Sequence, residues 1–210
     1  MSHNEVWDLV ELPHGCKPIG CKWVFKTKRN SKGQIERYKA RLVAKCFSQK
    51  EGINYKETFS PVSTKDGFRI IMAIVAHFDL ELHQMDVKTA FLNGDLYENV
   101  YMTQPIGFKV DGKEHLVCKL KKSIYGLKQA SRQWYLKFDI VVTTNGFKEN
   151  IFDQCIYMRV SGSSYIFLVL YVGDILLASN DTDLLLETKD ILSSHFDMKD
   201  LGYASYVLGI

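Results

Sequence analysis

The segment that decides the fold is YIFLVLYVGDILLAS, residues 165–179. Two apolar runs, 165–172 and 175–179, flank the dipeptide Gly173-Asp174, and Gly-Asp is a favoured two-residue loop between antiparallel strands. We therefore predict a β-hairpin that carries the carboxylate of Asp174 at its tip.

Helices and strands interleave in the rest of the chain without a βαβ repeat. Helical spacing of apolar residues is found in three segments. The first runs to Phe78 and starts at Ser63 or Thr64, either of which can cap the helix. The second is 129–145, with Trp134 in its apolar face and Gly146 after its end, and the third is 182–196. Strands are predicted at 18–29, 34–46, 80–88, 155–160 and in YVLGI at 206–210. The predicted fold class is therefore α+β, an antiparallel sheet backed by helices.

Composition is that of a folded globular protein. The 210 residues suit one domain of ordinary size, and 46% of them are hydrophobic. The five cysteines are odd in number and scattered, so we expect reduced thiols rather than disulfides or a zinc site. The first residues show no signal peptide, and the longest apolar run, 165–172, is too short to span a bilayer. We expect a soluble intracellular protein that does not bind membranes.

Positive charge is concentrated near the N-terminus. The segment Lys17–Lys50 holds eleven basic residues and one acid, Glu36, whereas the remainder holds 16 basic and 23 acidic residues. Such asymmetry indicates a polyanionic partner, with nucleic acid as the first choice. On charge alone, a solvated lysine-rich hairpin explains the pattern equally well.

The same region is predicted to form a basic β-hairpin around the turn residues Asn30 to Gly33. Alternation along its first strand places Trp23 and Phe25 on one face. Lys22, Val24 and Lys26 then lie on the other face.

Two carboxylates are candidates for chemistry. Asp86 lies near the end of the apolar strand 80–88, where an unpaired carboxylate is costly unless it is exposed or binds a metal. Taken alone, Asp86 is explained by exposure at a strand end, and Asp174 by ordinary turn chemistry. Together, two carboxylates on adjacent strand ends can share a divalent cation such as Mg²⁺.

Long motifs in the chain resemble those of one known family. In order, they are IGCKWVFKTKRNSKGQIERYKARLVAK, ETFSPV, ELHQMDVKTAFLNGDL, VYMTQPIGF, CKLKKSIYGLKQASRQWY and YVGDILLASND. They are similar to the reverse transcriptase of copia-type LTR retrotransposons, plant copies in particular, which is part of a Pol polyprotein. The resemblance covers about residue 5 to residue 210.

The resemblance implies a right-hand polymerase fold. Its fingers would be formed by about 1–79 and 96–128, and its palm by about 80–95 and 129–210, with the thumb absent. It also implies RNA-directed DNA synthesis with two Mg²⁺ ions, a template-primer and deoxynucleoside triphosphates as partners. The family's location is the cytoplasm, in virus-like particles, and the nucleus.

The resemblance assigns roles to the carboxylates and their neighbours. Asp86 matches the family's first catalytic aspartate, a ligand of both metals, and Asp174 matches the second aspartate of its Tyr-Val-Asp-Asp turn. Gly173 stands where the family has the first aspartate of that turn, and glycine cannot supply a carboxylate. Because the lost charge is worth several kcal/mol, we expect activity to fall roughly a thousandfold or more. Lys199 is a candidate general acid, although a solvated surface lysine explains it equally well.

Further residues match positions that bind the nucleotide or the nucleic acid in the family. Phe91 would pack under the incoming sugar, and Trp134 is read as helix packing. The expected nucleotide contacts are Lys39 and Arg41 from the fingers, the turn Lys88, Thr89 and Ala90, and Gln129. The expected primer and template contacts are Tyr171, Val172, Lys121 and Lys122, with Lys119 and Lys128 beside them.

Two other positions depart from the family pattern. Cys46 replaces a usual glycine, which would strain the backbone if that position needs a positive φ. Tyr203 stands where a glutamate is usual. With Gly173, these departures suit a decaying copy, so a non-catalytic nucleic-acid-binding remnant, or a remnant without function, stays as an alternative.

Overall fold

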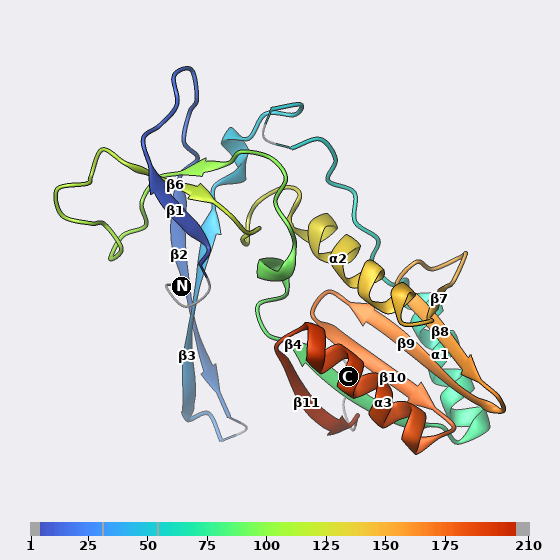
Figure 1. Cartoon of the computed structure of the whole chain (residues 1–210). Coiled ribbons are helices and arrows are strands. Elements are labelled where there is room, and N and C mark those ends of the chain that lie inside the picture. The colour runs from blue at the N-terminus through green and yellow to red at the C-terminus, as the bar shows by residue number, and fades with distance from the viewer. Residues whose placement is uncertain (1–4, 31, 54, 205–210) are drawn as a thin grey trace. The chain divides into compact units, whose positions relative to one another are not determined.

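The computed structural model describes residues 5–30, 32–53 and 55–204 (Figure 1). The chain divides into two compact units. The first comprises Met1–Phe59 and Phe91–Trp134, and the second Ser60–Ala90 and Tyr135–Ile210. The predicted α+β class is confirmed, because the described residues combine three α-helices with antiparallel sheets.

A six-stranded antiparallel sheet forms the second unit, in the order β11-β4-β10-β9-β8-β7. Its strands are β4 Glu81–Val87, β7 Lys148–Glu149, β8 Ile156–Ser161, β9 Ser164–Tyr171, β10 Asp174–Ser179 and β11 Met198–Tyr203. The helices are α1 Lys65–Phe78, α2 Ala130–Thr144, whose first turn belongs to the first unit, and α3 Thr182–His195. Helix α1, which the sequence assignment gave to the fingers, thus lies in the second unit.

Helices cover both faces of this sheet. On one face, Ile71 of α1 packs with Ile156, Val169 and Leu176 from three neighbouring strands. On the other face, Phe138 of α2 contacts the ring of Tyr157. Central strand β10 is buried on both faces, which explains why its sequence reads as a continuous apolar run rather than an alternating one.

The first unit contains a three-stranded sheet, β1-β6-β5, and a separate two-stranded hairpin, β2–β3. The strands are β1 Trp7–Val10, β2 Cys21–Arg29, β3 Ile35–Ala44, β5 Tyr101–Met102 and β6 Val117–Leu120, with short 3-10 helices η2 Cys46–Ser48 and η3 Ala90–Asn93. A buried cluster that includes Ile19, Leu42, Met102 and Ile124 ties the base of the hairpin to the small sheet.

Most predicted elements are confirmed within one to three residues, including the basic hairpin and all three helices. Trp134 is buried, in agreement with its interpretation as a packing residue. Helical spacing from Ile71 would extend the apolar face of this helix to Phe78, but Phe78 is exposed at the last position of α1. The predicted strand at 206–210 lies outside the described residues, and β11 was not predicted.

The central hairpin is correctly predicted, but its turn is displaced by one residue. Tyr171 pairs directly with Asp174, so the loop consists of Val172 and Gly173, and Asp174 is the first residue of β10. The apolar run permits either alignment. Packing of Ile175 and Leu177 on one face and Leu176 on the other then fixes the register.

No helix in the described ranges is long and apolar enough to cross a membrane.

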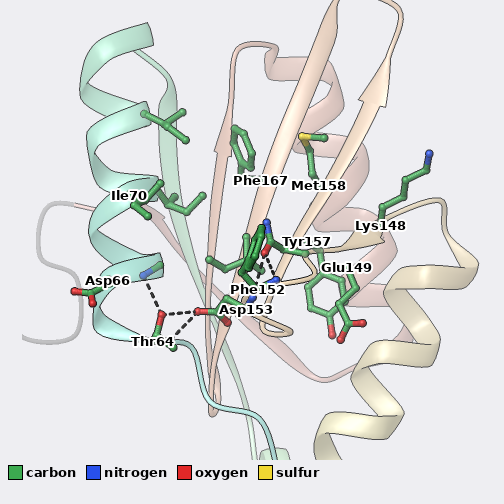
Figure 2. A pocket seen from close by; sticks show the side chains of 15 residues that line it. Thr64, Asp66, Ile70, Lys148, Glu149, Phe152, Asp153, Tyr157, Met158 and Phe167 are labelled. Atoms are coloured by element: carbon green, nitrogen blue, oxygen red, sulfur yellow. Dashed lines mark hydrogen bonds between the residues drawn. The ribbon is translucent and has the colours of Figure 1, made fainter.

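Asp153 anchors the start of α1. Its Oδ2 accepts hydrogen bonds from the Thr64 amide at 2.7 Å and the Thr64 hydroxyl at 3.0 Å (Figure 2). It also accepts one from the Ser63 hydroxyl at 3.2 Å. The Thr64 hydroxyl in turn caps the helix by accepting from the Gly67 amide at 2.9 Å. One buried carboxylate therefore joins α1 to the loop before β8.

We expect Asp153→Ala to lower the free energy of unfolding by about 2–4 kcal/mol, because it leaves the buried Ser63 hydroxyl and the partly buried Thr64 donors without this acceptor. Urea denaturation followed by circular dichroism measures the change. Asp66→Ala is the matched control, since Asp66 is an exposed residue on the same helix turn. Equal stability of the two variants would contradict this role for Asp153.

Candidate functional site

Four predicted site residues lie in one row across four neighbouring strands. Asp174 pairs with Tyr171 on β9 and with Asp86 on β4, and Asp86 pairs with Lys199 on β11. Directly paired residues project from the same face of a sheet, with Cβ atoms about 5 Å apart. The row therefore gathers two carboxylates, one ammonium and one phenol on the face that α1 covers only in part.

The turn next to the row is tightly constrained. Val172 adopts a φ of 58°, a left-handed conformation that is unusual for a β-branched residue. The Gly173 carbonyl accepts a hydrogen bond of 2.8 Å from the Val87 amide. Tyr171 and Val172 are both partly exposed at this end of the hairpin. The backbone of the turn is thus held against the end of β4.

Gly173 does not need to be glycine for its conformation or for space. Its φ lies outside the left-handed region, and an added Cβ would meet Ala90 Cβ at 3.6 Å and Asp86 Oδ1 at 3.9 Å, which are ordinary contacts. A side chain at this position would therefore extend from a point beside the Asp86 carboxylate.

Gln84 supports the row and was not singled out from the sequence. Its Nε2 donates a hydrogen bond of 3.0 Å to Asp174 Oδ1. Gln84 precedes Asp86 by two residues on the same strand, so both side chains share one face. That spacing is the signal that could have identified it.

The donors of the row suit a divalent cation in number and type. Mg²⁺ in proteins commonly takes one or two carboxylates and completes its shell with water and substrate phosphates. Asp86 and Asp174 supply two carboxylates, with Gln84 holding one oxygen of Asp174. Across the described residues, no group of three or more His, Cys, Asp or Glu side chains is placed to hold a metal ion.

The turn after β4 is engaged within the second unit. The Lys88 amide donates to the Asp197 carbonyl at 2.9 Å, and its ammonium to the Asp197 carboxylate at 2.7 Å. Thr89 has a φ of 54°, and Ala90 is buried. Asp197 therefore holds both the amide and the half-exposed ammonium of Lys88 in this arrangement.

Other predicted nucleotide contacts lie in the first unit. Phe91 packs against the ring of Tyr125, with centroids 4.7 Å apart, and the Arg41 guanidinium lies 5.5 Å from the same ring. The buried Nε of Arg41 has no hydrogen-bond partner among the described residues. Gln129 is fully buried and accepts a hydrogen bond of 3.1 Å from Gln49. Arg41 and Phe91 are thus brought together through one ring.

The predicted template lysines differ in their surroundings. Lys121 forms an ion pair with Asp8 at 3.3 Å, whereas Lys122 is exposed. Lys119 opposes Asp8 in the β1–β6 ladder, and Lys128 lies over the ring of Tyr55. Acidic or aromatic residues therefore accompany three of these four lysines.

A pocket of about 470 Å³ lies in the second unit between α1 and the β7–β8 segment (Figure 2). Apolar side chains such as Ile70, Tyr157 and Phe167 line much of it. Asp153 also lines the pocket, and its carboxylate accepts the hydrogen bonds at the start of α1. None of the predicted site residues lines this pocket. It is therefore separate from the carboxylate row.

Comparison with known proteins identifies the family. Residues 4–210 match the family described as "Reverse transcriptase (RNA-dependent DNA polymerase)". The chain belongs to this reverse transcriptase family. It is 51% identical over its whole length to the "Retrovirus-related Pol polyprotein from transposon TNT 1-94" of Nicotiana tabacum, covering 16% of that protein. It is 44% and 43% identical, over 99% of the chain, to the corresponding polyproteins from transposons RE2 and RE1 of Arabidopsis thaliana, covering 14% of each.

The resemblance to copia-type retrotransposon reverse transcriptases is thereby confirmed, and the chain spans about a sixth or less of the length of these relatives. Two of the departures from the reverse transcriptase pattern can be placed. Cys46 does not adopt a positive φ, so the strain considered for it is not present. Tyr203 lies on β11, where its ring packs on His83 with centroids 4.4 Å apart.

Behind the row, on the opposite face of β4, lies an ionic cluster that sequence inspection missed; its His83 and Lys189 are buried and its Asp200 is exposed. The Lys189 ammonium of α3 lies 2.7 Å from His83 Nδ1 and 2.8 Å from Asp200 Oδ2. Asp200 Oδ1 also accepts from the Gly202 amide at 2.8 Å, at the bulge of β11. The cluster therefore fastens edge strand β11, which carries Lys199, to β4 and α3.

Burial shapes the protonation of this cluster. Burial lowers the pKa of His83, and the Lys189 charge lowers it further, against the opposing effects of Asp200 and Glu81. Burial acts to raise the pKa of Asp200, but hydrogen bonds from Lys189 and Gly202 outweigh it and leave that pKa lowered. The cluster thus favours neutral His83 beside charged Lys189 and Asp200.

We expect the free energy of unfolding to fall as the pH drops below about 6.5, because unfolded His83 binds a proton that folded His83 resists. The lowered pKa of Asp200 adds a further loss in strong acid, below its ordinary value of 3.8. Urea titrations across this pH range measure the effect. His83→Gln should flatten the step near 6.5, and His115→Gln, at an exposed site, should not. An unchanged step in His83→Gln would contradict the assignment.

Proposed function

We propose that this chain is the fingers and palm of a right-hand RNA-directed DNA polymerase from a retrotransposon Pol polyprotein, with activity strongly impaired at Gly173. In this proposal the first unit is the fingers and the second unit is the palm. The observation that carries it is the direct pairing of Asp86 with Asp174, flanked by Lys199, on one face of a helix-backed antiparallel sheet.

The proposed reaction joins a deoxynucleoside triphosphate to a primer 3′-hydroxyl. Mg²⁺, when bound, would supply the charge that activates this hydroxyl and stabilises the leaving pyrophosphate. Asp86 and Asp174 would hold the metal, and Gln84 would orient Asp174 through Oδ1. Lys199 lies beside Asp86 in register, which suits a residue that gives a proton to the leaving group.

Gly173 is the proposed lesion. A side chain there would start 3.9 Å from Asp86 Oδ1, so a carboxylate at 173 would join the other two as a third ligand. Without it, two metal ions share too little negative charge. Because several kcal/mol of charge stabilisation are lost, we expect a rate lower by roughly a thousandfold or more.

The remaining contacts are proposed for template-primer and nucleotide. Arg41 has a buried Nε without a partner among the described residues, which suits a guanidinium that meets a triphosphate, with Lys39 beside it. Phe91, held by Tyr125, suits a platform for the deoxyribose. Because Gln129 is buried, its proposed role is indirect: its hydrogen bond with Gln49 would stabilise the fingers around the nucleotide. Tyr171, Val172, Lys121 and Lys122 would contact the primer and template strands.

A second candidate is a nucleic-acid-binding remnant without catalysis. The missing carboxylate at Gly173 and the cationic β2–β3 hairpin both favour it. This candidate predicts nucleic-acid binding that weakens with salt. Unlike the first candidate, it predicts that no single substitution at position 173 restores DNA synthesis.

The test is Mg²⁺-dependent primer extension by the unmodified chain, Gly173→Asp and Gly173→Asn on one template. We expect Gly173→Asp to extend primers roughly a thousandfold faster than the unmodified chain, because it restores a charged ligand. Gly173→Asn is the matched control, with the same shape and no charge, and should stay slow. Asp86→Asn in the Gly173→Asp background should abolish the gain. Equal, measurable rates in the unmodified chain and Gly173→Asp would contradict the proposal that Gly173 impairs activity. Inactivity of both would favour the non-catalytic nucleic-acid-binding remnant.

A further inference from the structure

Two large apolar residues that are adjacent in sequence project from the loop between β7 and β8. Ile151 is 86% exposed and Phe152 is 88% exposed, so folding buries almost none of either side chain. A single exposed apolar residue is ordinary on a protein surface, but neighbouring large ones beside an apolar pocket mark a site of interaction. This pair is therefore suited to anchor a partner.

Hydrogen bonds hold the loop that carries the pair. Asn150 Oδ1 accepts hydrogen bonds from the Phe152 amide at 2.8 Å and from the Asp153 amide at 3.1 Å. Asp153 Oδ1 in turn accepts from the Cys155 amide at 3.1 Å. Because the loop is already ordered, little conformational entropy is lost when a partner covers its side chains.

The pocket between α1 and the β7–β8 segment lies beside these anchors, and Phe152 is one of its lining residues (Figure 2). Ile70 from α1, together with Met158 and Phe167 from the strands, gives it apolar walls. A cavity of about 150 Å³ holds a benzene ring. The pocket of about 470 Å³ therefore has room for a phenylalanine ring and a second apolar side chain. One surface of the second unit thus presents both a projecting apolar group and a pocket that can receive one.

Charged side chains of both signs line the same pocket. Asp66 and Glu149 are acidic, and Lys148 is basic. Two carboxylates at this place disfavour a polyanionic partner such as nucleic acid. A small apolar ligand would fill the pocket but would leave Ile151 and Phe152 exposed. A second copy of the chain satisfies every feature, because it brings the same projecting ring, the same pocket and charges of both signs.

We propose that two copies of this chain associate about a two-fold axis through this surface, with Phe152 of each copy inserted into the pocket of the other. In an interface of this symmetry the same patch is used twice, so a projecting group and its pocket must lie on one surface. Rim charges of opposite sign pair across the axis in the same reciprocal way. The inference goes beyond the proposed function and does not rest on it, because no residue of the carboxylate row lines the pocket.

Sedimentation velocity of the full chain, over protein concentrations up to about 100 μM, measures this association directly. Phe152→Ala removes the inserted ring, and Ile70→Glu places a charge in the wall of the pocket that receives it. Both side chains are mostly exposed, so neither change disturbs the core. Leu186→Ala and Leu186→Glu are the matched controls, because Leu186 is an exposed leucine of α3 that does not line the pocket.

The unmodified chain and both controls should form dimers with equal dissociation constants. Phe152→Ala and Ile70→Glu should each raise the dissociation constant at least about a hundredfold, because a two-fold interface loses the same contact twice.

A mixture of the two variants separates a reciprocal contact from a general loss of apolar surface. The ring retained in Ile70→Glu can still enter the unaltered pocket of Phe152→Ala, so one of the two contacts survives. The mixture should therefore dimerise at least about tenfold more tightly than either variant alone.

An unmodified chain that stays monomeric at about 100 μM would overturn the proposal and leave the surface to a different protein or a small apolar ligand. A dimer that Phe152→Ala leaves intact would also overturn it, as would a mixture no tighter than its components or assemblies larger than a dimer. None of these measurements needs polymerase activity, so the proposed function is tested separately.

Discussion

The direct pairing of two carboxylates, Asp86 and Asp174, is the constraint on which the second unit depends. Like charges on opposed positions of an antiparallel pair cost stability unless a cation or a donor intervenes. The chain provides a donor from Gln84 on one side and an ammonium from Lys199 on the other. In the proposed function, a divalent cation between the carboxylates would offset the rest of this repulsion.

The rest of the second unit maintains this pairing. Burial of β10 on both faces fixes its register against β4, and a slip of one residue would turn Asp174 into the core. Two contacts hold edge strand β11 in position: the ion pair of Lys189 with Asp200 and the packing of the Tyr203 ring on His83. The position of Lys199 beside Asp86, on one face of β4, therefore depends on the ionic cluster on the other face.

Pattern alone predicted the elements that have strong periodicity. The helices, the basic hairpin and the two carboxylate strands follow from spacing, caps and turn residues, and the resemblance supplied the site residues. The displaced turn at Val172 could not be predicted, because an apolar run allows two registers and only packing chooses between them. Strand β11 was missed because its residues are mostly exposed and polar. Lys88, Gln129 and Lys189 have partners that are distant in sequence, and local sequence patterns do not identify such contacts.

Metal binding by the paired carboxylates is measured by titration with manganese, in the presence of a chain-terminated template-primer and the next nucleotide. Electron paramagnetic resonance detects the bound manganese. The unmodified chain, Gly173→Asp and Asp86→Asn would be compared. We expect weak manganese binding by the unmodified chain, tighter binding and a second bound ion in Gly173→Asp, and loss of binding in Asp86→Asn. Equal manganese binding by the unmodified chain and Asp86→Asn would contradict this expectation, because the paired carboxylates would then hold no metal.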